Sequence, residues 1–251
     1  MGKLDNKIAL ITGSSSGIGK AVALAFAREG AHVVINYPNE TQAANAKGVN
    51  DAIAALGRRV LNVQADVSQE EQVRKLVDET MQAYGRIDIL VNNAGIATAA
   101  TVEKMAAAMW DQMLAVNLRT VFLCTHYVLP IMYQQNYGKI ISTASQLAYK
   151  GSPGLSHYCA AKAAIIAFTR SLSLEIGTRN INANCVAPGA TETPILSSIS
   201  KEAIEAIRAS IPKGRLATVD EIAPAYVFLA SEEARHFVGQ CISPNGGDVM
   251  L

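Results

Sequence analysis

The stretch Ile8–Gly19, IALITGSSSGIG, decides the fold. The apolar run Ile8–Thr12 predicts a buried strand, and the amphipathic run Gly17–Arg28 predicts the helix that follows it. Glycines in the turn between them let backbone N–H groups approach a pyrophosphate, and the N-terminus of the helix adds favourable charge. The turn therefore indicates a dinucleotide site, while a turn selected only for close packing remains the alternative.

The spacing of these glycines, G-x-x-x-G-x-G, separates the turn from two related motifs. It is not the G-x-G-x-x-G fingerprint, and it is not a nucleoside-triphosphate loop, because no Gly-Lys-Ser/Thr follows. The turn does lie after a first strand and before a helix, which is the context that dinucleotide binding requires. We expect cofactor contacts from Gly13, Ser15, Ser16, Gly17, Ile18 and Gly19.

Short apolar runs alternate with longer amphipathic runs along the rest of the chain. Strands are predicted at residues 8–12, 31–36, 59–65, 87–91, 139–145, 181–186 and 240–243, with helices at 17–28, 41–56, 69–84, about 106–135 and around Tyr158. Strands separated by helices, without hairpin dipeptides, predict a parallel sheet. Continuous apolar strands predict that helices cover both faces. We expect one α/β domain over residues 1–251, a doubly wound Rossmann-type sheet of about seven strands.

The segment Ala190–Pro212 lacks strand character and contains a short helical stretch, SKEAIEAIRASI. It follows the sixth predicted strand, so it lies near the carboxyl ends of the strands, where open α/β sheets bind ligands. We predict that residues 190–212 form a substrate lid.

Composition excludes several classes of protein. Half of the 251 residues are hydrophobic and 17% are charged, which argues against disorder, and the net charge of +1 does not indicate nucleic acid or an anionic membrane. No segment approaches ~18 uninterrupted apolar residues, and the N-terminal apolar run is too short for a signal peptide. The four cysteines lie far apart with no C-x-x-C pair, so we expect reduced thiols, no metal and a cytoplasmic protein. They are Cys124, Cys159, Cys185 and Cys241.

Tyr158 and Lys162 lie four residues apart, and on a helix such residues share a face. A free tyrosine has a pKa of about 10, and a neighbouring cation lowers it. The pair therefore resembles an acid/base device, with Ser145 thirteen residues before the tyrosine. A tyrosine and a lysine one turn apart also occur by chance, with the lysine in solvent, so the pair alone leaves both interpretations open.

Polar residues also follow the third and fourth predicted strands. Asp66, in the phrase QADVS with Val67, can accept a hydrogen bond from an adenine amino group, or it can be an ordinary helix N-cap. The phrase Asn92-Asn93-Ala94-Gly95 lets a ligand pass close to the backbone while its amides tie strand ends together, or it can be a plain turn.

Two further positions complete the set. Asn117 lies within the apolar helical run MLAVNLRTVFL, where an asparagine is unfavourable, so it marks either a function or a satisfied buried group. Pro188-Gly189 ends the sixth strand, and the hydroxyls of Thr191 and Thr193 come next, within reach of a carboxamide or phosphate.

Together these motifs resemble the short-chain dehydrogenase/reductase family over nearly the whole chain, in the family's order and spacing. The resemblance implies a nicotinamide dinucleotide and hydride exchange between a carbonyl and an alcohol. It implies that Tyr158 is the acid/base, that Ser145 hydrogen-bonds the substrate oxygen, that Lys162 lowers the tyrosine pKa and holds the ribose, and that Asn117 organises a water. Beyond the glycine turn it implies cofactor contacts at Asn36, Tyr37, Asp66, Val67, Asn93, Ala94, Gly95, Tyr158, Lys162, Pro188, Gly189, Thr191 and Thr193.

The chemistry of the residues agrees with this resemblance, because carbonyl reduction develops negative charge on oxygen. Hydroxyl donors at Ser145 and Tyr158 stabilise that charge, and one of them delivers the proton. A non-catalytic dinucleotide-binding sensor is the alternative of another class, but it would not need all four catalytic positions. An epimerase usually carries a larger C-terminal region.

The end of the second predicted strand, Asn36-Tyr37-Pro38-Asn39-Glu40, bears on the choice of cofactor. An acid there binds the ribose diol of NAD, and by family position Tyr37 replaces it. Ser16 stands where many NADP-dependent members carry arginine, and no cation lies nearby in sequence. We expect NADP(H) and leave NAD(H) open.

Substrate and assembly are less readable. Candidate pocket residues describe a mostly apolar pocket that fits a 3-oxoacyl thioester, a small ketone or a sugar, so a glucose-type dehydrogenase stays an alternative. We take His157 as a packing residue rather than a second base. The helices of Asn117 and Tyr158 carry apolar residues beyond one narrow stripe, which indicates a helix-to-helix interface in a homotetramer, and the C-terminal tail is expected at a subunit contact. The pocket candidates are Ala97, Thr98, Gln146, Leu147, Tyr149, Gly154, His157, Ile195 and Leu196.

Overall fold

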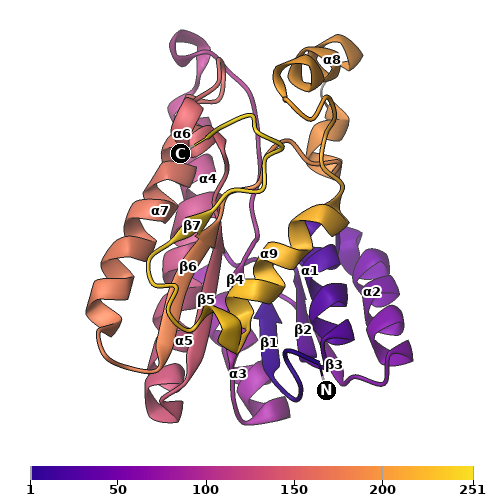
Figure 1. Ribbon diagram of the computed structural model, residues 1–251, viewed down its shortest axis with the longest axis vertical. Helices are drawn as coiled ribbons and strands as arrows, with labels where there is room; N and C mark the ends of the chain where they lie inside the picture. The colour runs from indigo at the N-terminus through magenta and orange to yellow at the C-terminus, as the bar shows by residue number, and fades with distance from the viewer. Residues whose placement is uncertain (1, 199, 251) are drawn as a thin grey trace.

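The computed structural model describes residues 2–198 and 200–250. Within these residues seven strands form one parallel sheet in the order β3-β2-β1-β4-β5-β6-β7 (Figure 1). The chain steps outward from β1 in one direction and then from β4 in the other, which is the doubly wound arrangement that the sequence predicts. The strands are β1 Ile8–Ile11, β2 His32–Tyr37, β3 Val60–Gln64, β4 Ile89–Asn92, β5 Gly138–Thr143, β6 Ile181–Val186 and β7 Cys241–Ile242.

Helices cover both faces of this sheet (Figure 1). One apolar core joins the sheet to α1 Gly17–Arg28, α2 Ala43–Ala55 and α9 Val219–Ala230. The other joins it to α3 Glu70–Tyr84, α5 Thr120–Gln135 and α7 Ser156–Ile176. Every residue of β1, β4, β5 and β6 is buried. Because burying a Val, Leu or Ile side chain contributes about 1.5–3 kcal/mol, the continuous apolar strands favour this two-sided packing.

The predicted helix at residues 106–135 is interrupted. It consists of α4 Ala107–Leu114, a π-helical turn η3 Ala115–Arg119, and α5. Asn117 lies in this turn and is buried. Single π turns inside α-helices commonly occur at functional sites, so the unfavourable asparagine coincides with a local change in helix geometry.

The combined stretch Ala107–Gln135 has the length and composition to cross a membrane, with a mean hydropathy of 1.3. No other helix in the described ranges 2–198 and 200–250 has both. The sequence alone did not predict such a span. The second half of this stretch is α5, which packs against α3, β4 and β5. Part of the apolar surface of the stretch therefore belongs to the core.

The carboxyl ends of the strands carry the loops that surround the site. The predicted lid contains a 3₁₀ turn, η4 Pro194–Ser198, and α8 Lys201–Ser210, while Ile199 lies outside the described residues. α8 stands beyond the sheet at the same end as α6 Leu147–Lys150, and the C-terminus lies beside α6 (Figure 1). β5 ends at Thr143, two residues before its predicted end, so Ser145 lies in the loop that leads to α6.

Candidate active site

Ser145, Tyr158 and Lys162 meet where β5 ends and α7 begins. Tyr158 is half-buried, and the neighbouring Ser145 hydroxyl acts to lower the pKa of its phenol. Lys162 is buried, and its Nζ lies 5.6 Å from the centroid of the Tyr158 ring. The same Nζ donates a hydrogen bond to the Thr143 carbonyl at 2.8 Å. This bond holds the Lys162 side chain of α7 against the end of β5.

Burial moves the pKa values of both titratable groups. It raises the pKa of the Tyr158 phenol, and the Ser145 hydroxyl partly opposes that shift. Burial lowers the pKa of the Lys162 ammonium to about 8. Below that pH the lysine is still charged, and a cation close to the ring favours the phenolate.

Asn117 faces the same centre from the π turn. Its Nδ2 donates to the Ile96 carbonyl at 3.0 Å and to the Met113 carbonyl at 3.2 Å. Its Oδ1 is buried and accepts no hydrogen bond within the described part of the chain. A Cβ added to Gly95 would lie 2.6 Å from that oxygen and 3.6 Å from Lys162 Nζ. Glycine at position 95 therefore leaves the oxygen open to a further donor.

The glycine turn forms a cradle at the N-terminus of α1. Gly13 has φ +62°, and a Cβ there would lie 2.9 Å from the Ala94 Cα. A Cβ at Gly19 would lie 2.4 Å from Asn93 Nδ2. The N-cap Ser16 makes no side-chain cap hydrogen bond, so the first-turn amides of α1 are left for another acceptor. These features fit the pyrophosphate of a dinucleotide.

The N-N-A-G phrase holds this turn against β4. Asn93 Nδ2 donates to the Thr12 carbonyl at 3.0 Å and to the Gly13 carbonyl at 3.1 Å. The Thr12 hydroxyl accepts from the backbone N–H groups of Asn93 and Ala94, both at 3.0 Å. The amides thus tie the ends of β1 and β4 together, as the sequence suggests. Thr12 was absent from the predicted site residues.

The residues predicted to hold the adenosine half of the cofactor differ in how far their polar atoms already bond to the protein. Asn36 is buried, its Oδ1 accepts from the Gly13 N–H at 3.2 Å, and its Nδ2 donates to the Ala65 carbonyl at 2.9 Å, so its amide holds the turn in place. Asp66 Oδ1 accepts from the Ser68 N–H at 3.0 Å and hydroxyl at 2.8 Å, a loop-capping pattern that occupies one carboxylate oxygen. Val67 is buried, while Tyr37 ends β2 half-buried.

The segment after β6 reaches back towards the glycine turn. A Cβ on Gly17 would lie 3.6 Å from Thr193 Cγ2, so Thr193 stands across the cradle. Thr191 is buried and donates its hydroxyl to the Gly189 carbonyl at 2.9 Å. The Gly189 N–H donates to the Pro244 carbonyl at 3.0 Å, which anchors the Pro188-Gly189 bend to the C-terminal tail.

Comparisons with known proteins identify the family of this chain. The model of a family described as "Enoyl-(Acyl carrier protein) reductase" matches residues 13–248. A (2S)-[(R)-hydroxy(phenyl)methyl]succinyl-CoA dehydrogenase subunit of Thauera aromatica is 40% identical over 97% of both chains. A 3-oxoacyl-[acyl-carrier-protein] reductase of Thermotoga maritima is 39% identical over 99% of this chain and all of that one. The chain belongs to the short-chain dehydrogenase/reductase family.

Solved structures of family members have the same fold. Levodione reductase matches with a TM-score of 0.92 and 33% identity, over 97% of this chain and 98% of that chain. A short-chain dehydrogenase/reductase from Mycobacterium marinum gives the same TM-score and identity over 99% and 97%. The chain is therefore an NAD(P)-dependent oxidoreductase that acts on a carbonyl or alcohol of a small molecule. The predicted family, fold and reaction class are confirmed, and nothing supports the sensor alternative.

Three of the predicted substrate-pocket residues join two loops of the site, and a fourth holds the C-terminal tail. Thr98 and His157 lie together, with Thr98 Oγ1 3.1 Å from His157 Nε2, and the Ala100 N–H donates to the Gly154 carbonyl at 2.9 Å. These contacts join the loop after β4 to the loop before α7. Gln146 instead donates to Asp248 Oδ2 at 2.5 Å, so its amide anchors the C-terminal tail.

Four other candidates have the following environments. Tyr149 makes a side-chain hydrogen bond with Cys241 and packs in a cluster under α7. Ile195 is 47% exposed on the lid, and Leu196 lines a lid groove of about 460 Å³ with Ile204. Leu147 is half-buried at the start of α6.

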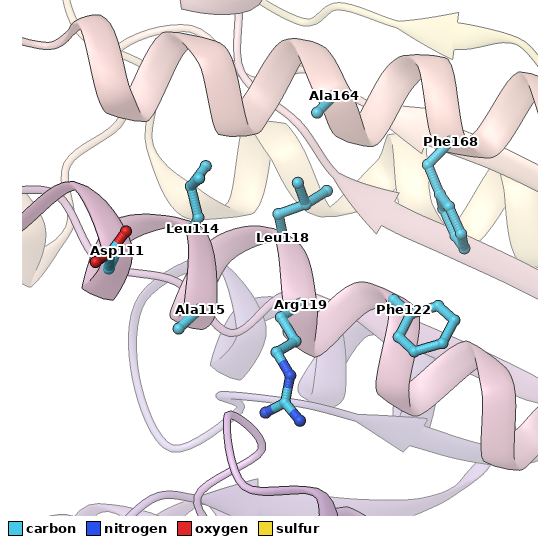
Figure 2. Close-up of a pocket in the computed structure, with 8 residues that line it drawn as sticks. All are labelled: Asp111, Leu114, Ala115, Leu118, Arg119, Phe122, Ala164 and Phe168. Carbon is cyan, nitrogen blue, oxygen red and sulfur yellow. The ribbon is translucent and has the colours of Figure 1, made fainter.

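A larger groove of about 530 Å³ lies between α4–α5 and α7, and none of Ser145, Tyr158, Lys162 and Asn117 lines it. Figure 2 shows Leu114 and Leu118 directed towards α7, which contributes Ala164 and Phe168. Asp111, Ala115, Arg119 and Phe122 complete the lining. The groove belongs to the helix face that the sequence marks as apolar. Among residues 2–198 and 200–250 no group of three or more His, Cys, Asp or Glu could hold a metal.

Proposed function

We propose that this enzyme reduces 3-oxoacyl thioesters with NADP(H). The observation that carries the proposal is the buried ammonium of Lys162, whose Nζ lies 5.6 Å from the centroid of the Tyr158 ring, with Ser145 as a polar neighbour of the phenol. Tyr158, Ser145, Lys162 and Asn117 are the catalytic residues in this proposal. Residues 1–251 form one dinucleotide-binding domain, with residues 190–212 as its lid.

The bound nicotinamide supplies a hydride equivalent to the carbonyl carbon or takes it back from the alcohol carbon. Tyr158 donates a proton to the substrate oxygen, and the Ser145 hydroxyl donates a second hydrogen bond to the same oxygen. Lys162 stabilises the phenolate that Tyr158 leaves behind, and its fixed contact with the Thr143 carbonyl orients it. Asn117 Oδ1, open beside Gly95 and Lys162, is placed to receive a water that returns the proton.

The cradle residues named from the sequence hold the cofactor in this proposal. The residues Ser15–Gly19 would hold the pyrophosphate, and Asn93, Ala94 and Gly95 would lie beside the nicotinamide half. Thr193 closes the cradle from the other side. Asn36 and Thr191 position the cradle rather than contact the cofactor, because their side chains hydrogen-bond to the backbone of Gly13 and Gly189.

Two relatives with different names motivate the substrate class. One is named for a hydroxyacyl-CoA dehydrogenase and the other for a 3-oxoacyl reductase, so both names describe an oxygen on the β-carbon of a thioester. The family description names an enoyl reductase instead. Reduction of a carbon–carbon double bond needs a proton at carbon, whereas Ser145 and Tyr158 are neighbouring hydroxyls that suit one substrate oxygen. Carbonyl reduction is therefore favoured.

A substrate panel tests this proposal. With NADPH, we expect kcat/KM for acetoacetyl-CoA to exceed that for a small ketone by at least about tenfold, because pocket contacts discriminate by ~1–3 kcal/mol. Crotonyl-CoA, and glucose with NADP⁺, serve as probes of the enoyl and sugar alternatives. Preferred turnover of crotonyl-CoA or glucose would replace the substrate proposal.

Cofactor preference is tested by initial rates with NADPH and NADH. β2 ends at Tyr37, so no carboxylate occupies the strand end where it would repel a 2′-phosphate. The Ser15 hydroxyl donates to Gln42 Oε1 at 3.3 Å, which is a contact between neutral groups. We expect kcat/KM for NADPH to be about tenfold higher, equivalent to one charge-assisted hydrogen bond. An equal or higher value for NADH would contradict the proposed preference.

We propose that the groove of Figure 2 is part of a homotetramer interface. Phe122 is 50% exposed and Trp110 39% exposed on the same helical stretch, which leaves a large apolar surface on one chain. The Phe122→Asp variant should therefore have a smaller mass by sedimentation velocity than the wild type. Leu56→Asp, at a 43% exposed leucine that ends α2, is the matched control and should keep the wild-type mass. A monomeric wild type would refute the interface.

The proposed compartment is the cytoplasm. The four cysteines are free in the structure, as expected where thiols are kept reduced.

A further inference from the structure

Cys185 and Cys241 form a pair of thiols outside the catalytic residues. They are register partners on the adjacent parallel strands β6 and β7. Both side chains pack in the same apolar cluster, and each thiol affects the pKa of the other. Neighbouring strands lie about 4.7–4.9 Å apart, and disulfide-bonded Cα atoms are usually about 4.4–6.8 Å apart. The sheet therefore holds the two backbones at a separation that a disulfide accepts.

The two thiols differ in access and in acidity. Cys185 is 1% exposed, and its Sγ lies 3.1 Å from Thr169 Oγ1. Cys241 is partly exposed on the edge strand. Cys185 lowers the pKa of Cys241 most, and Tyr149 and Arg170 lower it further, while burial opposes them. An accessible thiol with a low pKa is the one that oxidants attack.

The thiol pair is connected to the catalytic residues on two sides. Cys185 Sγ lies 3.9 Å from the Ile165 carbonyl, in the turn of α7 that follows Lys162. Cys241 is hydrogen-bonded to Tyr149 of α6, and α6 begins two residues after Ser145. Joining the two sulfurs removes the thiol protons from these contacts and pulls the side chains together beneath α7. A disulfide here would therefore displace Ser145 and Lys162 relative to Tyr158.

We propose that Cys185 and Cys241 form a reversible redox-modification site, at which disulfide formation lowers turnover. With hydrogen peroxide, the Cys241 sulfur attacks one oxygen, the O–O bond breaks, and a sulfenic acid and one water result. The Cys185 sulfur then attacks the Cys241 sulfur, the S–S bond forms, and the S–O bond breaks. The Cys185 proton leaves with the hydroxide as a second water. Peroxide thus gains the two electrons that the two thiols lose.

The test compares pre-reduced wild-type protein before and after hydrogen peroxide. Peptide mass spectrometry should show a cross-link between the peptides of Cys185 and Cys241, a result that does not depend on the proposed substrate. The rate of NADPH oxidation with acetoacetyl-CoA should fall several-fold and recover after dithiothreitol. Cys241→Ser should keep its activity under the same oxidant. If Cys241→Ser folds poorly, Cys185→Ala takes its place, and it should likewise keep its activity under the same oxidant.

Cys159 supplies the matched control, because it is the other partly exposed thiol and is adjacent to Tyr158. Cys159→Ser should remain as sensitive to peroxide as the wild type. Burial raises the pKa of Cys124 to about 12, so that thiol should stay unmodified. Equal loss of activity in Cys241→Ser, or consumption of the Cys241 thiol without a cross-link to Cys185, would overturn the proposal.

Discussion

The Tyr158→Phe variant is expected to lose on the order of 10²–10⁴ of kcat, the contribution typical of a positioned acid/base. The substitution removes one oxygen atom and leaves the ring, which is half-buried beside Lys162. The phenol is the partner of Ser145, so its loss removes both the proton donor and one hydrogen bond to the developing oxyanion. Steady-state rates with NADPH and acetoacetyl-CoA measure the effect.

Cofactor affinity separates this loss from a folding defect. The glycine cradle and the N-N-A-G phrase do not involve the phenol, so the dissociation constant for NADPH, followed by fluorescence, should change little. Tyr127→Phe is the matched control, because its exposed hydroxyl bonds Glu70 on α3. A Tyr158→Phe enzyme with near-normal turnover would remove Tyr158 from the mechanism.

The Lys162→Met variant should be inactive yet more stable than the wild type without cofactor. The pKa of Lys162 falls from 10.5 to about 8 in the fold. Keeping this ammonium charged therefore costs about 3 kcal/mol at neutral pH. Methionine removes that cost but leaves the Thr143 carbonyl without its donor, a penalty of about 1–3 kcal/mol. We expect a net gain of about 1 kcal/mol, equivalent to a Tm increase of about 2–4 °C.

The stability difference between Lys162→Met and the wild type should depend on pH. The folded pKa of Lys162 lies below the unfolded value, so the free-energy cost of its buried charge is absent above pH 10.5 and reaches its full size as pH falls through about 8. The stability advantage of Lys162→Met should accordingly be largest below pH 8 and shrink as pH rises towards 10.5. Lys47→Met, at an exposed lysine of α2 that pairs with Asp51, is the control and should gain no stability at pH 7. A variant less stable than the wild type at pH 7 would contradict the buried-charge explanation.

Much of the fold followed from local sequence patterns. Strands such as β1 and β4 are mostly apolar because helices bury both of their faces, so their positions could be recognised without knowledge of the partners. α9 was missed, although Thr218 and Glu221 form a capping box at its start. The π turn at Asn117 depends on how the helix packs, which single-sequence periodicity does not report.

Site residues could be predicted from the sequence where the local geometry admits only one residue type or where their spacing fixes a shared face. The glycines lie where a Cβ would collide, and Tyr158 and Lys162 share one helix face. Contacts between distant residues were not predictable. Gln146 bonds Asp248 across the fold, and Cys241 meets Cys185 only through strand pairing. The sequence places both cysteines but does not show that β6 and β7 are neighbours.

The most direct test of the central claim uses NADPH that carries deuterium at both C4 positions. The wild-type enzyme and acetoacetyl-CoA are incubated with it, and the product is analysed by mass spectrometry. The mechanism assigned to Tyr158, Ser145 and Lys162 predicts 3-hydroxybutyryl-CoA with one deuterium, on the carbinol carbon, and almost no product from Tyr158→Phe. Absence of reduction by a wild-type enzyme with NADPH bound, or deuterium at another carbon, would contradict it.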